Sequence, residues 1–230
     1  MTTGILLALA GSFVFVFAAL GVGVLLFRTG VVDGFVSRKI IHITVAHWWF
    51  FHQFLIVDPL WGLVGPVFFL LFNLAARQHG FLKAMEPGKG ESNLGTVYFP
   101  ISLIVAVVFS GWGGMPTWVA GLGILVLGWG DGLAALVGKA WGRHLLPITW
   151  SRKTWEGTLA LVLASTVVIL VFLMVFTSPA NGLTPAWLGS QLAKATAVAL
   201  VLALVEALTP LGLDNLLLPL TASALVWVFL

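Results

Sequence analysis

The sequence contains no cysteine and few charged residues. Without cysteine the chain forms no disulfide and has no thiolate for catalysis or metal binding. Charged residues are 8% of the chain, against roughly 25% in soluble domains, so most of its surface must face lipid. The sequence also has neither a Walker-type loop ending in Lys-Ser/Thr nor a GxGxxG motif between a strand and a helix. Any nucleotide chemistry must therefore use the ends of membrane helices.

Long apolar runs dominate the sequence, in which 60% of residues are hydrophobic. A membrane helix needs about 20 such residues, and polar or Gly/Pro breaks separate the runs. They predict an all-α, polytopic integral membrane protein with about eight transmembrane helices in one domain, residues 1–230. The first run, from Gly4 to Phe27, has no basic residue before it and is too long for a signal-peptide core, so we interpret it as a retained, peripheral span. The expected spans are residues 4–27, 40–57, 59–76, 94–110, 116–140, 156–177, 190–208 and 215–230, and the last is short and contains Pro219.

Basic residues are concentrated in the segments that follow the first, third and fifth spans. Lys194 alone among the eleven Lys and Arg residues lies elsewhere. Cytoplasmic loops carry an excess of Lys and Arg, so we expect the charged face to be cytoplasmic and both termini to be outside. In a prokaryote the protein would reside in the cell membrane. Topology alone accounts for most of these basic residues.

Topology does not explain five acidic residues near span ends on the same face, where an unpaired charge is costly. Carboxylates beside many basic groups favour a site for a polyanion with a divalent metal ion. We expect Asp131 to hold Mg²⁺ or another divalent cation, helped by Asp214 or Glu206. The five acids are Glu91, Asp131, Glu156, Glu206 and Asp214.

The segment from Gly128 to Arg143 places Asp131 within an apolar span. At about 100° per residue, small residues up to Gly142 share the face of Asp131. They let either a neighbouring helix or a ligand approach the backbone, and close helix packing is the structural alternative. Packing does not explain the aspartate, so we interpret Asp131 as functional. The candidate nucleotide-binding residues here are Gly130, Gly132, Gly138, Lys139, Gly142 and Arg143.

Two further segments carry basic groups at span ends. Lys153 and Thr154 stand at the start of the sixth span, where Ser151 is a candidate cap and free N–H groups favour an anion; an ordinary capped start is the alternative. Arg38 and His42 are four residues apart and face the same way. The alternative for Arg38 is a basic residue that only sets the topology. The alternative for His42 is a histidine at a helix end whose hydrogen bonds are satisfied within the protein.

Histidine does not provide a metal site, because His47 and His52 do not share a face with His42. Glu91 fits a favourable first-turn acid as well as a catalytic one. Asp214 fits a helix cap as well as a metal ligand, whereas Glu206 lies inside the end of an apolar helix and needs a partner.

In order and spacing these segments resemble the CTP-dependent lipid-alcohol kinases, a group that includes phytol kinase, dolichol kinase and CTP-dependent diacylglycerol kinase and is distantly similar to the phosphatidate cytidylyltransferases. The resemblance covers residues 37–220, and the compact form looks closest to the phytol kinase and bacterial branch. Thr154 stands where family members often have serine. The matching pieces are Arg38-Lys39-x-x-His42, Gly130-Asp131-Gly132-x-Ala134-Ala135-x-x-Gly138-Lys139-x-x-Gly142, Lys153-Thr154-x-Glu156-Gly157-Thr158 and Glu206…Asp214-Asn215…Pro219.

The resemblance implies that Arg38, Lys39, Asp131 and Gly138 are needed for activity. It also implies CTP as phosphoryl donor and a prenyl-type alcohol or diacylglycerol as acceptor. We expect the basic residues Arg38, Lys39, Lys139, Arg143 and Lys153, with Thr154 and Asn215, to bind the nucleotide phosphates.

A carboxylate or His42 would take the proton from the lipid hydroxyl, with Glu91 preferred. The expected partners are CTP, the lipid alcohol and membrane lipids, with no nucleic acid. The sequence leaves the alcohol and the oligomeric state open. A cytidylyltransferase acting on a lipid phosphate, a small transporter and a structural membrane subunit are the alternatives.

Overall fold

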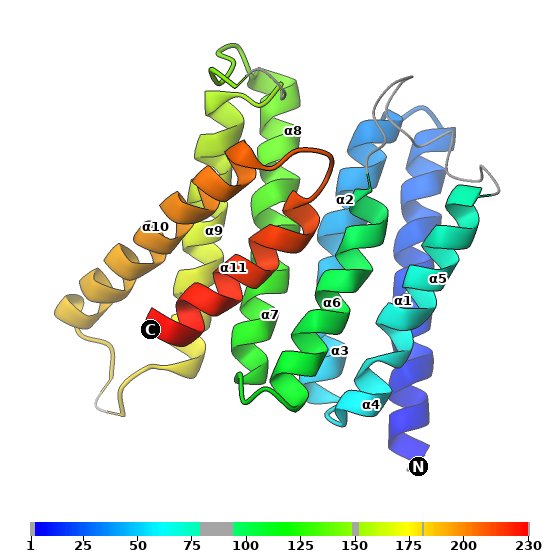
Figure 1. Cartoon of the computed structure of the whole chain (residues 1–230), viewed down its shortest axis with the longest axis horizontal. Helices are drawn as coiled ribbons and strands as arrows, with labels where there is room; N and C mark the ends of the chain where they lie inside the picture. The colour runs from blue at the N-terminus through cyan, green and yellow to red at the C-terminus, as the bar shows by residue number, and fades with distance from the viewer. Residues whose placement is uncertain (1–2, 79–93, 149–151, 181, 230) are drawn as a thin grey trace.

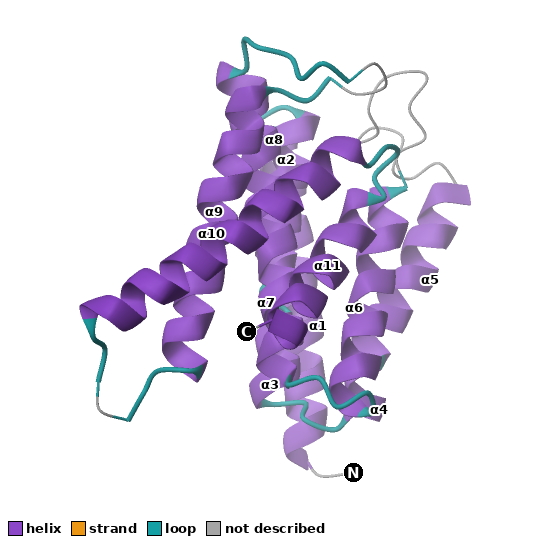
Figure 2. Cartoon of the chain, turned by 60° about the vertical axis from the view of Figure 1, so that its left-hand side comes forward, coloured by secondary structure: helices purple, strands orange, loops and turns teal. Residues whose placement is uncertain are grey.

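The computed structural model describes residues 3–78, 94–148, 152–180 and 182–229. Within these ranges every regular element is a helix, and only an isolated bridge joins Leu145 to Thr154 (Figure 2). The prediction of an all-α fold is therefore confirmed. The elements are α1 (Thr3–Arg28), α2 (Gly34–Ala46), α3 (Trp49–Phe54), α4 (Pro59–Gly62), α5 (Val64–Gln78), α6 (Gly95–Gly111), α7 (Thr117–Val126), η2 (Leu127–Asp131), α8 (Gly132–Trp141), α9 (Trp155–Phe176), α10 (Pro185–Leu208) and α11 (Asp214–Phe229).

These elements match the eight expected segments, with three of the segments built from shorter pieces. The second consists of α2 and α3 and begins at Gly34, six residues before the expected start at Ile40. The third consists of α4 and α5, and the fifth runs through α7, η2 and α8. Figure 1 shows α10 and α11 steeply inclined to the other helices.

Five of the continuous helical segments in the described part of the chain are long and apolar enough to cross a membrane. The shorter α6 and α11 are also apolar. At 1.5 Å per residue, the 16 residues of α11 extend about 24 Å, less than the ~30 Å hydrocarbon core. The chain is thus a helical membrane protein, and eight full crossings remain a prediction. The five segments are Thr3–Arg28, Pro59–Gln78, Thr117–Trp141, Trp155–Phe176 and Pro185–Leu208.

The connections separate by charge between the two ends of the bundle. The turns after α1, α8 and α10 lie toward one end, and those after α3, α6 and α9 lie at the other (Figure 1). The first group adjoins Arg28, Lys139 and Lys153, whereas the second adjoins Asp58 and no basic residue. The arrangement agrees with the predicted one-sided charge. Its cytoplasmic orientation remains an expectation.

The segment of α7, η2 and α8 forms the buried centre of the bundle. Its glycines lie where neighbouring helices touch the backbone. A Cβ at Gly123 would overlap the carbonyl oxygen of Pro219 in α11, and one at Gly128 would overlap Ala46 in α2. The π-helical turn η2 then ends at Asp131, and such turns occur often at functional sites.

Replacing Gly123 with alanine should therefore destabilise the protein by about 1–3 kcal/mol, because the added methyl meets rigid backbone. Gly189→Ala in α10 is the matched control, since nothing lies within 4 Å of its added Cβ, and alanine is the better helix former. Thermal unfolding in detergent should show a lower Tm for Gly123→Ala only. Equal Tm values for the two variants would contradict the close packing.

Candidate active site

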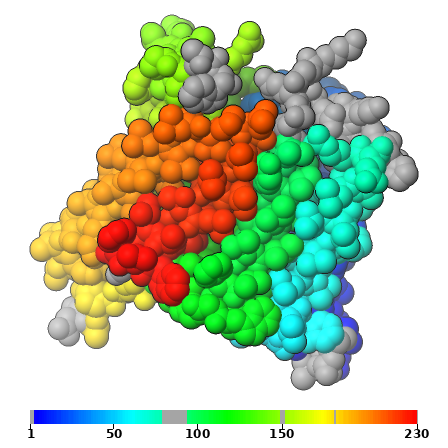
Figure 3. All heavy atoms as spheres, in the orientation of Figure 1, coloured from blue at the N-terminus to red at the C-terminus, as the bar shows by residue number. Residues whose placement is uncertain are grey.

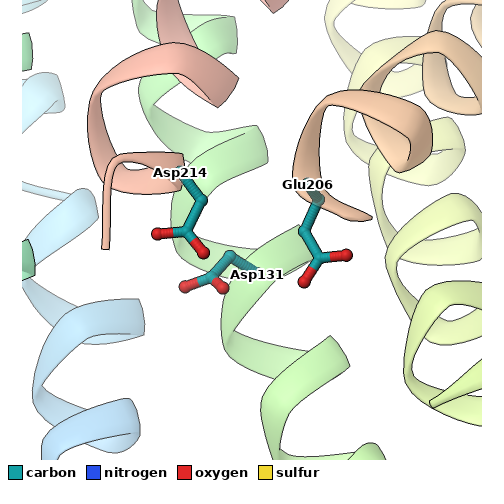
Figure 4. A group of neighbouring side chains, drawn as sticks. All are labelled: Asp131, Glu206 and Asp214. Carbon is teal, nitrogen blue, oxygen red and sulfur yellow. The ribbon is translucent and has the colours of Figure 1, made fainter. Parts of the chain in front are cut away.

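Three carboxylates from distant parts of the sequence meet at the charged end of the bundle. Asp131 ends η2, Glu206 lies in the last turn of α10 and Asp214 begins α11. A carboxylate oxygen from each lies within 4.8 Å of the others, and Figure 4 shows the three groups pointing toward one another. Asp131 and Glu206 are only 4% and 6% exposed. The structure thus brings together the three acids that the sequence assigns to a metal ion, and the metal assignment itself stays a prediction.

The short turn between α10 and α11 brings Glu206 and Asp214 together. Pro210 follows the end of α10, and proline cannot continue the helical hydrogen-bonding pattern. Leu211 and Gly212 then adopt positive φ angles of 58° and 81°. A leucine in this region costs free energy that the surrounding structure must offset, and its carbonyl accepts from Leu94 N–H at 3.3 Å.

Two lysines compensate the buried acids. Lys39 Nζ lies 2.6 Å from Asp131 Oδ2. Lys153 Nζ lies 2.8 Å from Glu206 Oε1 and 3.4 Å from Asp214 Oδ2, and it also donates to the Glu206 backbone carbonyl. Buried charges persist only when paired in this way, so the five side chains form one ionic cluster of three negative and two positive groups. We call these five residues the carboxylate cluster.

Helix α2 carries the second group of predicted residues. His42 Nε2 lies 3.6 Å from Asp131 Oδ2, and its ring centroid lies 5.1 Å from that of Phe99. Arg38, one turn earlier, lines the same cavity as His42. Their shared orientation agrees with the predicted helical spacing.

The start of α2 is held by hydrogen bonds that the sequence analysis did not identify. The Asp33 carboxylate caps α2 by accepting from Phe35 N–H and Val36 N–H, and Ser37 Oγ donates to the Gly23 carbonyl of α1 at 2.8 Å. A hydrogen bond from Lys139 is the main reason that the pKa of Asp33 is lowered. These contacts position Arg38, Lys39 and His42 against the carboxylate cluster.

Other predicted residues lie apart from this cluster. Lys139 pairs with Asp33 and sits 4.7 Å above the Phe35 ring. Arg143 is exposed beyond the end of α8, and Glu156 pairs with His144 at 2.7 Å. Glu91, the preferred proton acceptor, lies outside the described residues. Among the described residues, Lys139 and Arg143 form no ion pair with the three acids, so phosphate binding by these two residues stays a prediction.

The motif glycines are covered by protein. A Cβ at Gly130 would lie 2.6 Å from Ser165 Oγ of α9, one at Gly132 would overlap Ile43 of α2, and one at Gly138 would lie 3.1 Å from Thr154 Oγ1. At Gly142 the methyl would overlap the Gly138 carbonyl. The structure thus supports helix packing, the alternative explanation of these glycines. Their expected contact with a nucleotide remains untested.

Thr154 has a structural role that differs from the predicted one. It is the N-cap of α9, and its Oγ1 accepts from Gly157 N–H at 3.2 Å. A cap at Ser151 would place Lys153 and Thr154 in the first helical turn. This expectation is wrong, because the helix begins at Trp155 and Lys153 precedes its cap. The proposed cap, Ser151, lies outside the described residues.

Asn215 connects the carboxylate cluster to a cavity. Its side-chain amide donates to Asp214 Oδ1 at 2.9 Å and to the Gly212 carbonyl at 3.0 Å. Asn215 also lines a cavity of about 240 Å³ between α1, α2, α5 and α6. Apolar walls lead to polar groups beside the carboxylate cluster. The lining residues include Val16, Arg38, Lys39, His42, Val45, Trp48, Gly65, Phe69, Asn73, Phe99 and Leu103.

The contribution of α5 and α6 to this cavity was not predicted from the sequence. Asn73 Nδ2 donates to the Thr96 carbonyl at 2.7 Å and joins the two helices at the polar end. An asparagine within the apolar run 59–76 was the available signal, because buried amides in membranes need partners. The aromatic and aliphatic wall residues carried no distinguishing signal.

The arrangement combines a site suited to a cation and a polyanion with an apolar cavity. Carboxylate oxygens are ligands that Mg²⁺ prefers, and Arg and Lys side chains bind phosphate. The apolar cavity reaches the same point through His42 and Lys39. Such a place permits a water-soluble phosphate donor and a lipid acceptor to meet.

Comparison with known proteins supplies the family. The chain is 38% identical over 200 residues to a phytol kinase from Synechocystis sp., and the match covers 84% of this chain and 78% of that protein. No family model matches the chain. No solved structure matches it either. With this identity over most of its length, and with a helical membrane fold, the chain belongs to the phytol kinase family of lipid-alcohol kinases.

Proposed function

We propose that this protein transfers the γ-phosphate of CTP to the hydroxyl of a lipid alcohol, with phytol or a related prenol as the acceptor. The observation that carries the proposal is the meeting of Asp131, Glu206 and Asp214, paired with lysines, at the polar end of an apolar cavity. The phytol kinase similarity supports the acceptor class. CTP is proposed from the resemblance of the ordered motifs.

In the proposed reaction the acceptor hydroxyl oxygen forms a bond to the γ-phosphorus of CTP. The bond from this phosphorus to the β–γ bridging oxygen breaks, CDP leaves, and the hydroxyl proton passes to a nearby base. Transfer of this kind depends chiefly on alignment and charge neutralisation. His42 is a candidate base, since it lines the cavity and lies beside Asp131; the cluster carboxylates and Glu91 remain the other candidates.

The donor set fits a hard divalent cation, because three carboxylates offer oxygen atoms within 4.8 Å of one another. Asp131, Glu206 and Asp214 would hold Mg²⁺, which when bound supplies positive charge against the triphosphate. Lys39 and Lys153 already lie at these carboxylates and would neutralise phosphate oxygens. Arg38 would do the same from the cavity side.

Product analysis separates this proposal from its nearest alternative. Purified protein in mixed micelles, given CTP labelled at the γ-phosphate and phytol, should yield labelled phytyl phosphate and unlabelled CDP. A cytidylyltransferase would instead release labelled pyrophosphate from CTP and a lipid phosphate. ATP is the donor control, and farnesol, longer prenols and diacylglycerol are the acceptor controls.

Label transfer from ATP but not from CTP would refute the donor, and transfer to diacylglycerol alone would refute the prenol acceptor. Uptake of a solute into liposomes without any lipid alcohol would instead support a transporter.

A further inference from the structure

The cavity between α1, α2, α5 and α6 has two different ends. Side chains close one of them, which we call the enclosed end, and the other, which we call the reactive end, lies beside the proposed catalytic residues. Helices α1 and α2 pack together, as do α5 and α6, and the cavity lies where the two pairs face each other. Figure 1 shows these four helices grouped on one side of the bundle, and Figure 3 shows α5 and α6 at its surface beside α11.

At the enclosed end, two aromatic rings pack against the backbone of two glycines. A Cβ at Gly65 of α5 would lie 3.0 Å from Trp48 Cζ2, so the indole rests against the helix backbone. Trp48 is 2% exposed and stacks on His52, whose Nδ1 lies 2.9 Å from the Ile56 carbonyl oxygen. A Cβ at Gly62 would lie 2.5 Å from His52 Nδ1. Gly65 of α5 thus seats the Trp48 ring that lines the cavity, and Gly62 of α4 seats the His52 ring that stacks on Trp48.

The reactive end is at His42 and Lys39, which lie at Asp131. Trp48 follows His42 by six residues and lies just beyond the end of α2 at Ala46, and His47 and Trp48 keep right-handed helical backbone angles. At 1.5 Å per residue the separation is about 9 Å. Because an extended chain advances about 1.2 Å per bond, this depth accommodates roughly seven bonds.

This depth is smaller than the length of a long prenyl chain. We propose that this cavity binds the hydroxyl end and the first isoprenoid units of the lipid alcohol, with Trp48 on Gly65 as its floor and Val45 and Leu103 as its walls, while the remainder of the chain stays in the bilayer. This inference rests on the proposed lipid-alcohol kinase function. It assigns substrate recognition to the part of the alcohol nearest the hydroxyl.

Occluding the cavity should separate acceptor binding from donor binding. Val45→Phe should raise the KM for the alcohol at least about tenfold, as expected for overfilling a hydrophobic pocket, and leave the KM for CTP unchanged. Val167→Phe is the matched control, because Val167 of α9 is 59% exposed and lies outside the cavity. Lengthening the prenol beyond about eight carbons should change the KM less than about threefold in wild-type protein.

Cross-linking keeps the inference testable if Val45→Phe fails to fold or if CTP is not the donor. A prenol with a photoreactive diazirine near its hydroxyl, added to wild-type protein without nucleotide, should label peptides that contain Val45, Trp48 or Leu103. Excess phytol should prevent the labelling. Labelling of these peptides without any phosphorylation of the alcohol would refute the kinase proposal but would still support binding of the alcohol in this cavity.

Phosphorylation with labelling confined to α9 or α10 would overturn the cavity assignment. A normal alcohol KM in a folded Val45→Phe variant would overturn it as well. A steep dependence of KM on tail length would contradict partial enclosure of the chain.

Discussion

Asp131→Asn should lower kcat for phosphoryl transfer from CTP by about 10³-fold or more. The carboxylate is the central acid of the cluster, since it alone pairs with Lys39 and also faces Glu206 and Asp214. Losing one anionic ligand of a catalytic cation removes several kcal/mol of transition-state stabilisation, and each 1.36 kcal/mol is tenfold in rate. Initial rates at saturating CTP and alcohol measure the effect.

Two companion variants distinguish chemistry from folding. Asp58→Asn makes the same substitution at a cap of α4 on the other face, where asparagine is also a good cap, and should keep near wild-type activity. Asp131→Asn leaves Lys39 without its carboxylate, which lowers stability. Adding Lys39→Met should recover part of the Tm but none of the rate. Near-normal turnover by Asp131→Asn would show that the assignment of this residue is wrong.

Removing divalent cations should stop the reaction completely and reversibly. Three carboxylates would otherwise face the triphosphate, and two like charges 4 Å apart repel by about 4 kcal/mol at an effective dielectric constant of 20. The two cluster lysines offset only part of the combined negative charge. EDTA should abolish product formation, and excess Mg²⁺ should restore it.

A Mg²⁺ titration connects this requirement to the carboxylate cluster. Glu206→Gln should raise the Mg²⁺ concentration at half-maximal rate by about tenfold or more, since even changes to residues that only support a metal ligand typically cost 10–100-fold in metal affinity. Glu156→Gln is the matched control because Glu156 pairs with His144 and lies apart from the three acids. An activity that EDTA leaves unchanged would contradict the metal proposal.

Sequence patterns predicted the helices well and their interruptions poorly. The apolar runs identified each of the eight segments because lipid exposure demands about 20 apolar residues per span. They did not reveal the break at His47 and Trp48 between α2 and α3, or the π-helical turn that ends at Asp131. Such local departures depend on packing against neighbouring helices, and a period of 3.6 residues contains no information about them.

For the candidate active site too, the sequence predicted some features and left others undecided. Asp131 and Glu206 were predictable because a charge near an apolar span is costly unless it is used or paired. Lys39 was assigned to the site only through the resemblance of the motif Arg38-Lys39-x-x-His42, since topology alone explains a basic residue at this face. The cap of α9 was expected at Ser151 but is Thr154, three residues later, because caps are set by the exact start of the helix. The glycines around Asp131 fitted both a ligand and a helix neighbour, and only the contacts to Ile43 and Ser165 favoured packing.

The sequence by itself therefore determined the helical membrane fold, the one-sided distribution of charge and the acids that require an explanation. Composition and periodicity suffice for these properties because they depend on transfer between water and lipid. Only the tertiary structure decided that Lys153 compensates Glu206 and Asp214 and that Trp48 closes a cavity ending at His42. These relations join residues that are distant in the chain, and their geometry depends on how whole helices pack.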